Sequence, residues 1–146
     1  MLVLRQTAES GELRENHMKP IMTHGSKKKK AHYVPGMLHN GLLYISGQLS
    51  IDPATGRPKE GGIAAQARQA LENVDEVLRE AGIDRTHLVQ CRIYTPDVTY
   101  WDEIDRVYAA FLGDHKPARV VVPCGPLHYG CLVEIEAVAA MEKEDA

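Results

Sequence analysis

The feature that most constrains the fold of this chain is a helical repeat of apolar residues in its middle third. Between residues 63 and 81 these residues recur at every third or fourth position, which is the spacing of one face of an α-helix. Gly82 follows at the position where a glycine commonly ends a helix. The pattern therefore predicts a helix over about residues 63–81. Its apolar face comprises Ile63, Ala67, Ala70, Leu71, Val74, Val77, Leu78 and Ala81.

The neighbouring segments have the period of strands instead. Residues 42–46 are an apolar run that follows a turn signal, Asn40-Gly41. Residues 88–94 alternate between an apolar and a polar side, as in a strand with one buried face. The buried face of this second strand is expected to consist of Val89, Cys91 and Ile93.

A second helix and two further strands follow along the chain. Residues 100–112 repeat with helical spacing, and we expect Thr99 to cap this helix and Gly113 to end it. Residues 118–122 are a short β-branched strand, and residues 131–141 alternate as a final strand. The final strand is expected to bury Val133, Ile135, Ala137 and Ala139, and to present Leu132, Glu134, Glu136 and Val138 on its other face.

The order of these elements predicts an α+β fold, a two-layer sandwich in which two helices cover one face of a mixed β-sheet. The length of 146 residues fits one domain. Residues 1–17 show no period and are expected to form a flexible leader before a single domain over residues 18–146. Leu132, Val138 and Ala140, on the uncovered face of the last strand, indicate that another subunit buries that face.

Composition and charge exclude several functions. No apolar run approaches the roughly 20 residues of a membrane helix, and the first residues lack the order of a signal peptide, so we expect a cytoplasmic protein without a membrane partner. Its three cysteines are then expected to be reduced. Residues 1–30 carry seven Lys or Arg against three Asp or Glu, whereas residues 31–146 carry ten against seventeen. An acidic body repels a phosphate backbone, so we expect no nucleic-acid partner.

Two groups of polar residues could carry chemistry. Arg119 opens a strand and suits an anionic substrate, while desolvation of Glu134 in the middle of the last strand can raise its pKa into the range that handling a water proton requires. A structural ion pair, or two solvated charges, is the alternative interpretation. Cys124, His128 and Cys131 could instead bind zinc, or provide a thiol nucleophile with His128 as its base. Their spacing matches no common zinc motif, so we expect no metal there.

A run of four lysines, Lys27 to Lys30, precedes His32 and Tyr33. Such a run could form a nucleic-acid patch. It lacks interleaved aromatic residues beyond Tyr33, and most of the chain is acidic. A solvated stretch is therefore the favoured interpretation.

Several further segments form a recognisable combination. They are Leu43-Tyr44-Ile45-Ser46-Gly47-Gln48, the turn over residues 52–56, residues 64–74, Tyr108-Ala109-Ala110-Phe111, Pro117-Ala118-Arg119 and residues 133–139. In this order they resemble the reactive intermediate deaminases of the RidA/YjgF type. The resemblance extends from about Met18 to Met141, and its specificity lies in the combination, because each segment alone is weak.

The resemblance implies a fold like that of the monofunctional chorismate mutases, assembled as a homotrimer with ligand sites in the clefts between subunits. The implied reaction is hydrolysis of 2-imino acids, or of enamine tautomers such as 2-aminoacrylate, to 2-keto acids and ammonia. The implied partner is thus a small 2-imino or 2-keto carboxylate. No metal or organic cofactor is implied.

The resemblance also assigns roles to individual residues. Arg119 matches the arginine that holds the substrate carboxylate, and Glu134 matches the glutamate that positions the attacking water. Tyr33 matches a tyrosine that lines the cleft, and Gly47 matches a glycine whose backbone meets the ligand.

Two positions depart from the pattern of this family. Val121 stands where typical members have a cysteine, so that this position would contribute only its backbone carbonyl. Asp105 stands where an asparagine is common, and a carboxylate near a carboxylate substrate is unfavourable unless it points away or the preferred substrate differs. The loop over residues 124–130 also differs from the usual version. This difference is expected to affect the substrate preference more than the reaction itself.

Two other functions remain compatible with the resemblance. A binding protein for a carboxylate metabolite would keep Arg119 but would need no Glu134. An endoribonuclease of the translation-inhibitor type should have a basic cleft, which the acidic body disfavours. Imine hydrolysis is therefore the first expectation.

Overall fold

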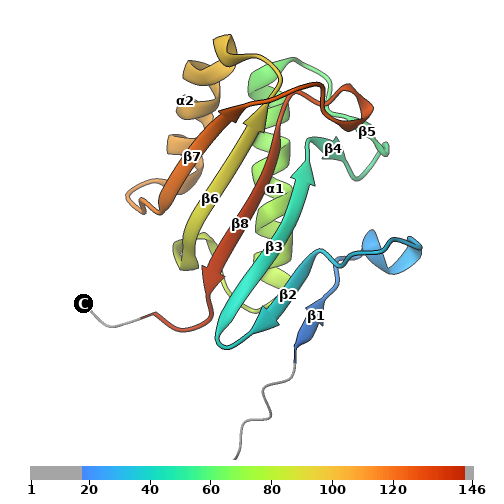
Figure 1. The fold of residues 1–146 in the computed structure, drawn as a ribbon, viewed down its shortest axis with the longest axis vertical. Helices are drawn as coiled ribbons and strands as arrows, with labels where there is room; N and C mark the ends of the chain where they lie inside the picture. Colours follow the sequence, from blue (N-terminus) through green and yellow to red (C-terminus); the bar gives the residue numbers. More distant parts are fainter. Residues whose placement is uncertain (1–17, 144–146) are drawn as a thin grey trace, which may run out of the picture.

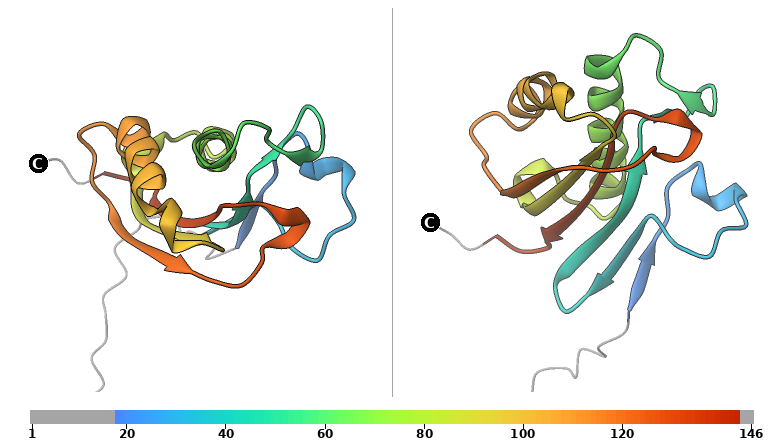
Figure 2. Two further views of the ribbon diagram at one scale, coloured as in Figure 1. Left: turned by 90° about the horizontal axis from the view of Figure 1, so that it is seen from above. Right: turned by 45° about the horizontal axis from the view of Figure 1, so that its top comes forward.

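The computed structural model describes residues 18–143, so the expected leader over residues 1–17 lies outside the described part of the chain. A six-stranded sheet forms one layer, and both long helices pack on one face of it (Figure 1). Seen from above, the helices lie together on one side of the sheet and leave the other side open (Figure 2, left). This confirms the predicted α+β arrangement of two helices on a mixed sheet.

The elements follow one another as β1 (Lys19–Ile21), η1 (Ser26–Lys28), β2 (Gly36–His39), β3 (Leu42–Leu49), β4 (Ile51–Asp52), β5 (Arg57–Pro58), α1 (Ile63–Glu80), η2 (Arg85–His87), β6 (Leu88–Thr95), η3 (Val98–Tyr100), α2 (Trp101–Leu112), β7 (Ala118–Pro123), η4 (His128–Gly130) and β8 (Glu134–Ala140). The η elements are single 3₁₀ turns. The sequence did not delimit β2 or the small β4–β5 hairpin.

The strands of the main sheet run in the order β1-β2-β3-β8-β6-β7. Only β6 and β7 are parallel, and α2 provides the crossover that a parallel pair requires. All other pairs are antiparallel. The strand that comes last in the chain, β8, therefore lies in the middle of the sheet, while β1 and β7 form its edges.

The hairpin between β2 and β3 turns through two residues with positive φ. Asn40 has φ 52° and Gly41 has φ 75°. This is the geometry of a type I′ turn, whose twist suits paired strands and for which Asn-Gly is the preferred sequence. The predicted turn is confirmed.

The ends of the two helices show where glycine and side-chain caps act. After α1, the Gly82 N–H donates to the Arg79 carbonyl (2.9 Å) and the Ile83 N–H to the Leu78 carbonyl (3.0 Å), which is a Schellman motif. Gly113 ends α2, as expected. The expected Thr99 cap is wrong: the Asp97 carboxylate accepts from the Thr99 N–H (2.8 Å) at the 3₁₀ turn that precedes α2.

The hydrophobic core lies between the helices and the sheet. Its fully buried side chains include Leu43, Leu71, Val74, Leu78, Ile93, Ile104, Val133 and Ile135. The predicted inward face of the last strand is confirmed, because Val133, Ile135, Ala137 and Ala139 are all buried.

Two expectations about the faces of strands are wrong, and so is one about the position of Glu134 along its strand. Val89 is 47% exposed, because the pairing of β6 with β8 is irregular between Leu88 and Gln90 and the alternation slips there. Leu132 packs against the core, because β8 begins only at Glu134 and the alternation does not extend back to it. Glu134 consequently lies at the start of its strand and not in the middle.

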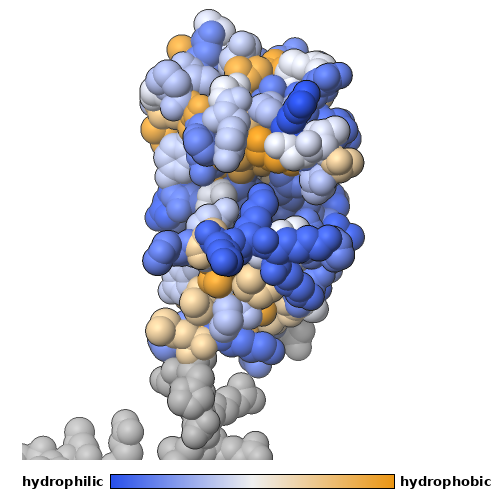
Figure 3. Space-filling view, turned by 90° about the vertical axis from the view of Figure 1, so that its right-hand side faces the viewer, coloured by the Kyte–Doolittle hydropathy of each residue, from blue (hydrophilic) through white to orange (hydrophobic). Residues whose placement is uncertain are grey.

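The open face of the sheet mixes apolar and polar groups. Tyr44 and Val120 are exposed, and Val138 and Ala140 are half-buried beside an ion pair of Arg92 and Glu136. The edge of the molecule that carries η1 is covered mostly by hydrophilic side chains (Figure 3), and Lys27 to Lys30 are exposed. Neither α1 nor α2 is long and apolar enough to cross a membrane, nor is any other helix within residues 18–143.

Candidate functional site

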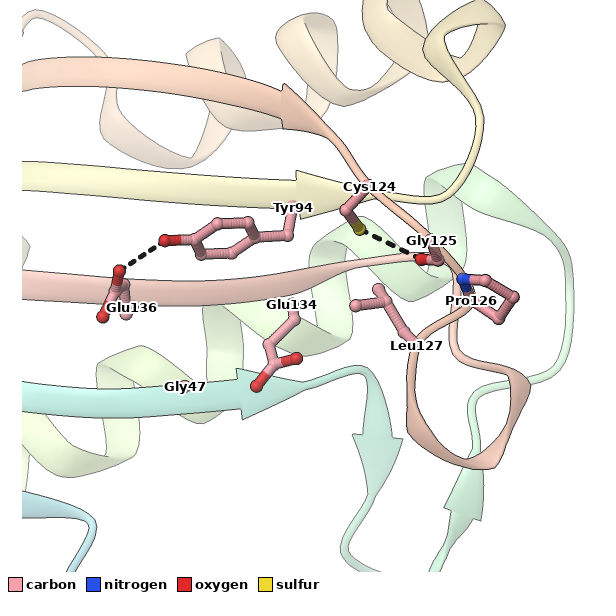
Figure 4. Close-up of a pocket in the computed structure, with 8 residues that line it drawn as sticks. All are labelled: Gly47, Tyr94, Cys124, Gly125, Pro126, Leu127, Glu134 and Glu136. Atoms are coloured by element: carbon pink, nitrogen blue, oxygen red, sulfur yellow. Dashed lines mark hydrogen bonds between the residues drawn. The ribbon is translucent and has the colours of Figure 1, made fainter.

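A pocket of about 410 Å³ opens on the uncovered face of the sheet, where β3 and β6 end and β8 begins (Figure 4). Two of the predicted site residues, Gly47 and Glu134, belong to its lining. The lining residues are Gly47, Tyr94, Cys124, Gly125, Pro126, Leu127, Glu134 and Glu136.

Gly47 and Glu134 are in close contact across the β3–β8 pair. A side chain at position 47 would place its Cβ only 2.3 Å from Glu134 Oε1, so the carboxylate occupies the space that the glycine leaves free. The pairing of the two strands is irregular between Ile45 and Gln48, which indicates a β-bulge around Gly47. The structure thus brings together two residues that are 87 positions apart in the chain (134 minus 47).

Partial burial and a neighbouring acid shape the chemistry of Glu134. Desolvation raises the pKa of the Glu134 carboxyl above its ordinary value, and the negative charge of Glu136 raises this pKa further, while His128 opposes the rise. A carboxylate with a raised pKa is a better proton acceptor than an exposed one. The position suits a general base.

Glu136 is held by two partners on the neighbouring strand β6. The Tyr94 hydroxyl donates to Glu136 Oε1 (2.5 Å), and Arg92 Nη1 lies 3.7 Å from the same oxygen. The hydrogen bond to Glu136 raises the pKa of Tyr94, so this phenol remains a hydrogen-bond donor. Tyr94 and Glu136 therefore form a fixed polar wall beside Glu134 (Figure 4).

Helix α1 anchors the chain on both sides of this pocket. Gln66 Oε1 accepts hydrogen bonds from Ser50 Oγ (2.7 Å), just after β3, and from the Leu132 N–H (2.8 Å), just before β8. Asn73 Nδ2 donates to the carbonyls of Leu49 and Ile51, at 2.9 Å each. One face of the helix therefore fixes the strand ends that carry Gly47 and Glu134.

Arg119 lies on the opposite face of the sheet, at the edge strand β7. In the strand register Arg119 is level with Cys91, whose side chain is buried, whereas Glu134 is level with Tyr94 on the open face. Arg119 Nη1 donates to Asp105 Oδ1 of α2 at 2.6 Å. One protomer by itself does not bring Arg119 to Glu134.

Aromatic side chains of α2 support the Arg119 guanidinium. Its Cζ lies 5.0 Å from the centroid of the Tyr108 ring and 6.0 Å from that of Trp101. Rings at these distances attract a cation through their faces. Asp105 thus meets Arg119 directly.

The other two residues that the resemblance assigned lie outside the pocket lining. Val121 is buried on the same face of β7 as Arg119. Tyr33 is 61% exposed in the loop before β2. That loop is tied to β3 immediately before Gly47, because Ser46 donates through Oγ to the Val34 carbonyl (2.6 Å) and through N–H to the Pro35 carbonyl (2.9 Å).

The cysteine and histidine alternative has no supporting geometry. Within residues 18–143 no three His, Cys, Asp or Glu side chains form a group suited to a metal ion. Cys131 is buried, Cys124 Sγ contacts the Gly125 carbonyl (3.2 Å), and the His128 ring lies against Tyr129. The three side chains therefore do not form the zinc site or the catalytic pair that their spacing allows.

Sequence reasoning missed two contributors to the pocket, namely Tyr94 and Glu136, whereas the lining residues 124–127 belong to the loop that departs from the family pattern. The alternation of β6 places Tyr94 on its polar face, and that of β8 places Glu136 beside Glu134. Their contact depends on the antiparallel register of β6 and β8, for which the sequence carries no signal.

Comparison with known proteins identifies relatives of this chain in sequence and in fold. Residues 25–141 match the model of the family described as endoribonuclease L-PSP. The human 2-iminobutanoate/2-iminopropanoate deaminase is 36% identical over 107 residues, which are 73% of this chain and 78% of the relative. A Rid family protein of unknown function from Yersinia pestis has a solved structure similar to this one, with a TM-score of 0.80 and 34% identity, covering 85% of this chain and 99% of that one.

A third similar protein was solved with a ligand. The structure of Escherichia coli TdcF with bound serine has a TM-score of 0.77 and 29% identity, and it covers 84% of this chain and 98% of that one. The family match spans most of the described residues and both halves of the candidate site. This chain therefore belongs to the endoribonuclease L-PSP family, the family of the YjgF and Rid proteins.

Proposed function

We propose that this protein hydrolyses reactive 2-imino acids and their enamine tautomers to 2-keto acids and ammonia. The observation that carries the proposal is the Glu134 carboxylate, which lies against Gly47 in an open pocket and has a raised pKa. Similarity to the human 2-iminobutanoate/2-iminopropanoate deaminase supports this reaction. A bound amino acid in the structure of TdcF supports a ligand with an α-carboxylate.

The active site is formed by two subunits of a homotrimer. Arg119 lies at a sheet edge and Glu134 on the open face, so a cleft that contains both needs the edge of one subunit against the open face of the next. The exposed Tyr44 and half-buried Val138 on that face are suitable contacts for a neighbouring subunit. Tyr33, Gly47 and Val121 complete the proposed cleft, the last through its backbone carbonyl.

In this cleft Arg119 binds the substrate carboxylate through paired N–H donors and thereby places the imine carbon. One water balances the reaction. Its oxygen forms a bond to the imine carbon while Glu134 accepts a proton, and that proton is passed to the nitrogen. The hydroxyl proton of the resulting carbinolamine then moves to the nitrogen as the C–N bond breaks and the carbonyl forms, which releases ammonia and leaves the 2-keto acid.

The reaction is tested by trapping. An amino-acid oxidase or dehydratase generates the imine, semicarbazide traps it, and the rate of semicarbazone formation is followed as this protein is added. We expect the rate to fall with wild-type protein and expect Arg119→Ala to lose more than about 100-fold in kcat/KM, because two charge-assisted hydrogen bonds are lost.

Arg106→Ala is the matched control. Arg106 is an exposed arginine of α2 whose ion pair within residues 18–143 is with Glu103, so its removal should leave the rate unchanged. Near wild-type hydrolysis by the Arg119→Ala variant contradicts the proposal. If no imine is consumed by the wild-type trimer, the cleft is a binding site for a carboxylate metabolite instead.

The proposal includes a place of action. Cys91, Cys124 and Cys131 are free thiols, which is the usual state of cysteines in the cytoplasm. There the protein would remove reactive imines before they damage other enzymes.

A further inference from the structure

Arg119 is already paired with a carboxylate of its own chain. The Arg119–Asp105 ion pair, at 2.6 Å, joins the edge strand β7 to helix α2. The Asp105 side chain is 52% exposed and that of Arg119 24%. A ligand that approaches the guanidinium therefore also meets the charge of Asp105.

The pair leaves part of the guanidinium available. Within residues 18–143, Nη1 is the only nitrogen of this group with a hydrogen-bond partner. The rings of Tyr108 and Trp101 lie against the flat side of the group, so they do not occupy its remaining N–H donors. A substrate carboxylate can thus bind Arg119 through Nε and Nη2 without displacing Asp105.

The surroundings of this pair are negatively charged. Helix α2 carries Asp102, Glu103 and Asp105 against the single cation Arg106. Asp105 balances the charge of Arg119, so a first carboxylate binds to a nearly neutral pair. A second carboxylate on the same small molecule would lie within about 10 Å of Asp105, a distance over which salt does not fully screen repulsion.

We propose that Asp105 sets the charge selectivity of the site, so that its ligands are 2-imino and 2-keto acids with neutral or basic side chains and those with a second carboxylate are rejected. This inference rests on the proposed function, because it assumes that Arg119 holds the α-carboxylate. Asp105 acts through Arg119 and through the field it creates, and it is a positioning and selectivity residue that takes no part in bond breaking.

The test compares ligands that differ mainly in one charge. Calorimetry measures binding of 2-oxopentanoate and 2-oxoglutarate, and the trapping assay measures kcat/KM for the imines derived from glutamine and glutamate. In the wild-type protein we expect the neutral ligand to be favoured at least about tenfold in both measurements. In Asp105→Asn, which keeps an oxygen that accepts from Nη1, we expect that preference to fall about tenfold.

Two further variants complete the design. Asp105→Ala should reduce the preference as Asp105→Asn does, which separates the lost charge from any new contact of the amide. Asp102→Asn is the matched control, because Asp102 lies on the same exposed surface of α2 and is not bonded to Arg119; it should change the preference less than about twofold.

The outcomes separate this inference from the proposed function. If Arg119→Ala abolishes 2-keto acid binding while Asp105→Asn and Asp105→Ala leave the preference unchanged, the selectivity role of Asp105 is wrong and the function stands. If Arg119→Ala leaves both binding and hydrolysis intact, Arg119 is not the carboxylate site and both proposals fail.

Discussion

At the scale of single residues, Gly47 is fixed by contact and not by backbone geometry. The Cα hydrogen of Gly47 that a side chain would replace faces Glu134 Oε1, and the end of a glutamate side chain can move aside at little cost. We therefore expect Gly47→Ala to change the free energy of unfolding by less than about 1 kcal/mol. Alanine lowers the conformational entropy of the unfolded chain, and this gain offsets the cost of moving the carboxylate. The displaced carboxylate should nevertheless lower kcat by about 10- to 100-fold.

Gly41→Ala should have the opposite effects on stability and activity. Gly41 has φ 75° in the β2–β3 turn, so alanine there is strained although its Cβ would meet no other atom within 4 Å. We expect this control to lose about 1 kcal/mol of stability in urea unfolding and to keep its activity. Equal activities of the two variants would show that the Gly47–Glu134 contact has no catalytic role.

The acid pair of the pocket predicts a pH dependence. Burial first and the charge of Glu136 second raise the pKa of Glu134, so the base form of Glu134 is lost at a higher pH than in an ordinary glutamate. In Glu136→Gln the second cause is removed. We expect the acidic limb of kcat/KM against pH to move to lower pH while remaining above the ordinary pKa of 4.5, because burial persists.

The exposed Glu60→Gln is the control for this profile, since Glu60 lies outside the pocket lining. Its acidic limb should coincide with that of the wild-type protein. An unchanged limb in Glu136→Gln would mean that Glu134 is not the group whose ionisation governs the rate.

At the scale of elements, α1 acts as a support for the strand ends as well as a wall of the core. Gln66 accepts hydrogen bonds from two groups of the flanking chain, whereas Gln69 is similarly buried and its one side-chain hydrogen bond within residues 18–143 is to Asn73 of the same helix (2.9 Å). Gln66→Leu should therefore cost about 2 kcal/mol or more of unfolding free energy, because Ser50 Oγ and the Leu132 N–H lose their partner.

Gln69→Leu is the matched control from the same helix and should cost less than half as much. Thermal or urea unfolding of both variants provides the comparison. If Gln69→Leu proves as costly as Gln66→Leu, the anchoring of the strand ends by Gln66 contributes nothing beyond an ordinary buried amide.

The elements that could be predicted from sequence are those with a regular period and a recognisable end. The helical repeat before Gly82 and the Asn40-Gly41 turn identify α1 and the β2–β3 hairpin, because period and turn chemistry are local. The irregular pairings near Gly47 and Val89 could not be predicted, since a bulge is defined by two strands that are distant in sequence. The contact of Gly47 with Glu134 depends on such a bulge.

In the candidate site, too, local features could be predicted from the sequence and contacts between distant segments could not. Arg119 and Glu134 could be identified by residue type and resemblance, because a guanidinium and a partly buried carboxylate are uncommon on strands. Their placement on opposite faces of one protomer, and the Asp105 partner of Arg119, depend on the packing of α2 against the edge strand. Packing of this kind is a tertiary property that a local pattern does not carry.

At the scale of the whole molecule, the proposed trimer gives two measurable outcomes. The mass in solution, by light scattering or sedimentation, should be about three times the 16.2 kDa of one chain. Arg119→Ala and Glu134→Gln variants, each inactive alone, should regain activity when unfolded together and refolded. With random mixing in equal amounts, about one quarter of the sites should combine an intact Arg119 with an intact Glu134.

Each variant refolded alone is the control and should stay inactive. The recovery arises only if the two residues of one site come from different subunits. An inactive mixture with the correct trimeric mass would place both residues of each site on the same chain and refute the shared cleft.

The central position of β8 has a consequence for the growing chain. Its neighbours β3 and β6 share no strand pairing, so the part of the sheet made first, β1 to β3, and the β6–α2–β7 unit are joined by hydrogen bonds only through residues 134–140. Until the ribosome has released this segment, two unclosed sheet edges are exposed, which is the condition under which strands pair with the wrong chain. Synthesis of the strand that brings Glu134 also closes the sheet, so the fold and the proposed general base are completed in the same step.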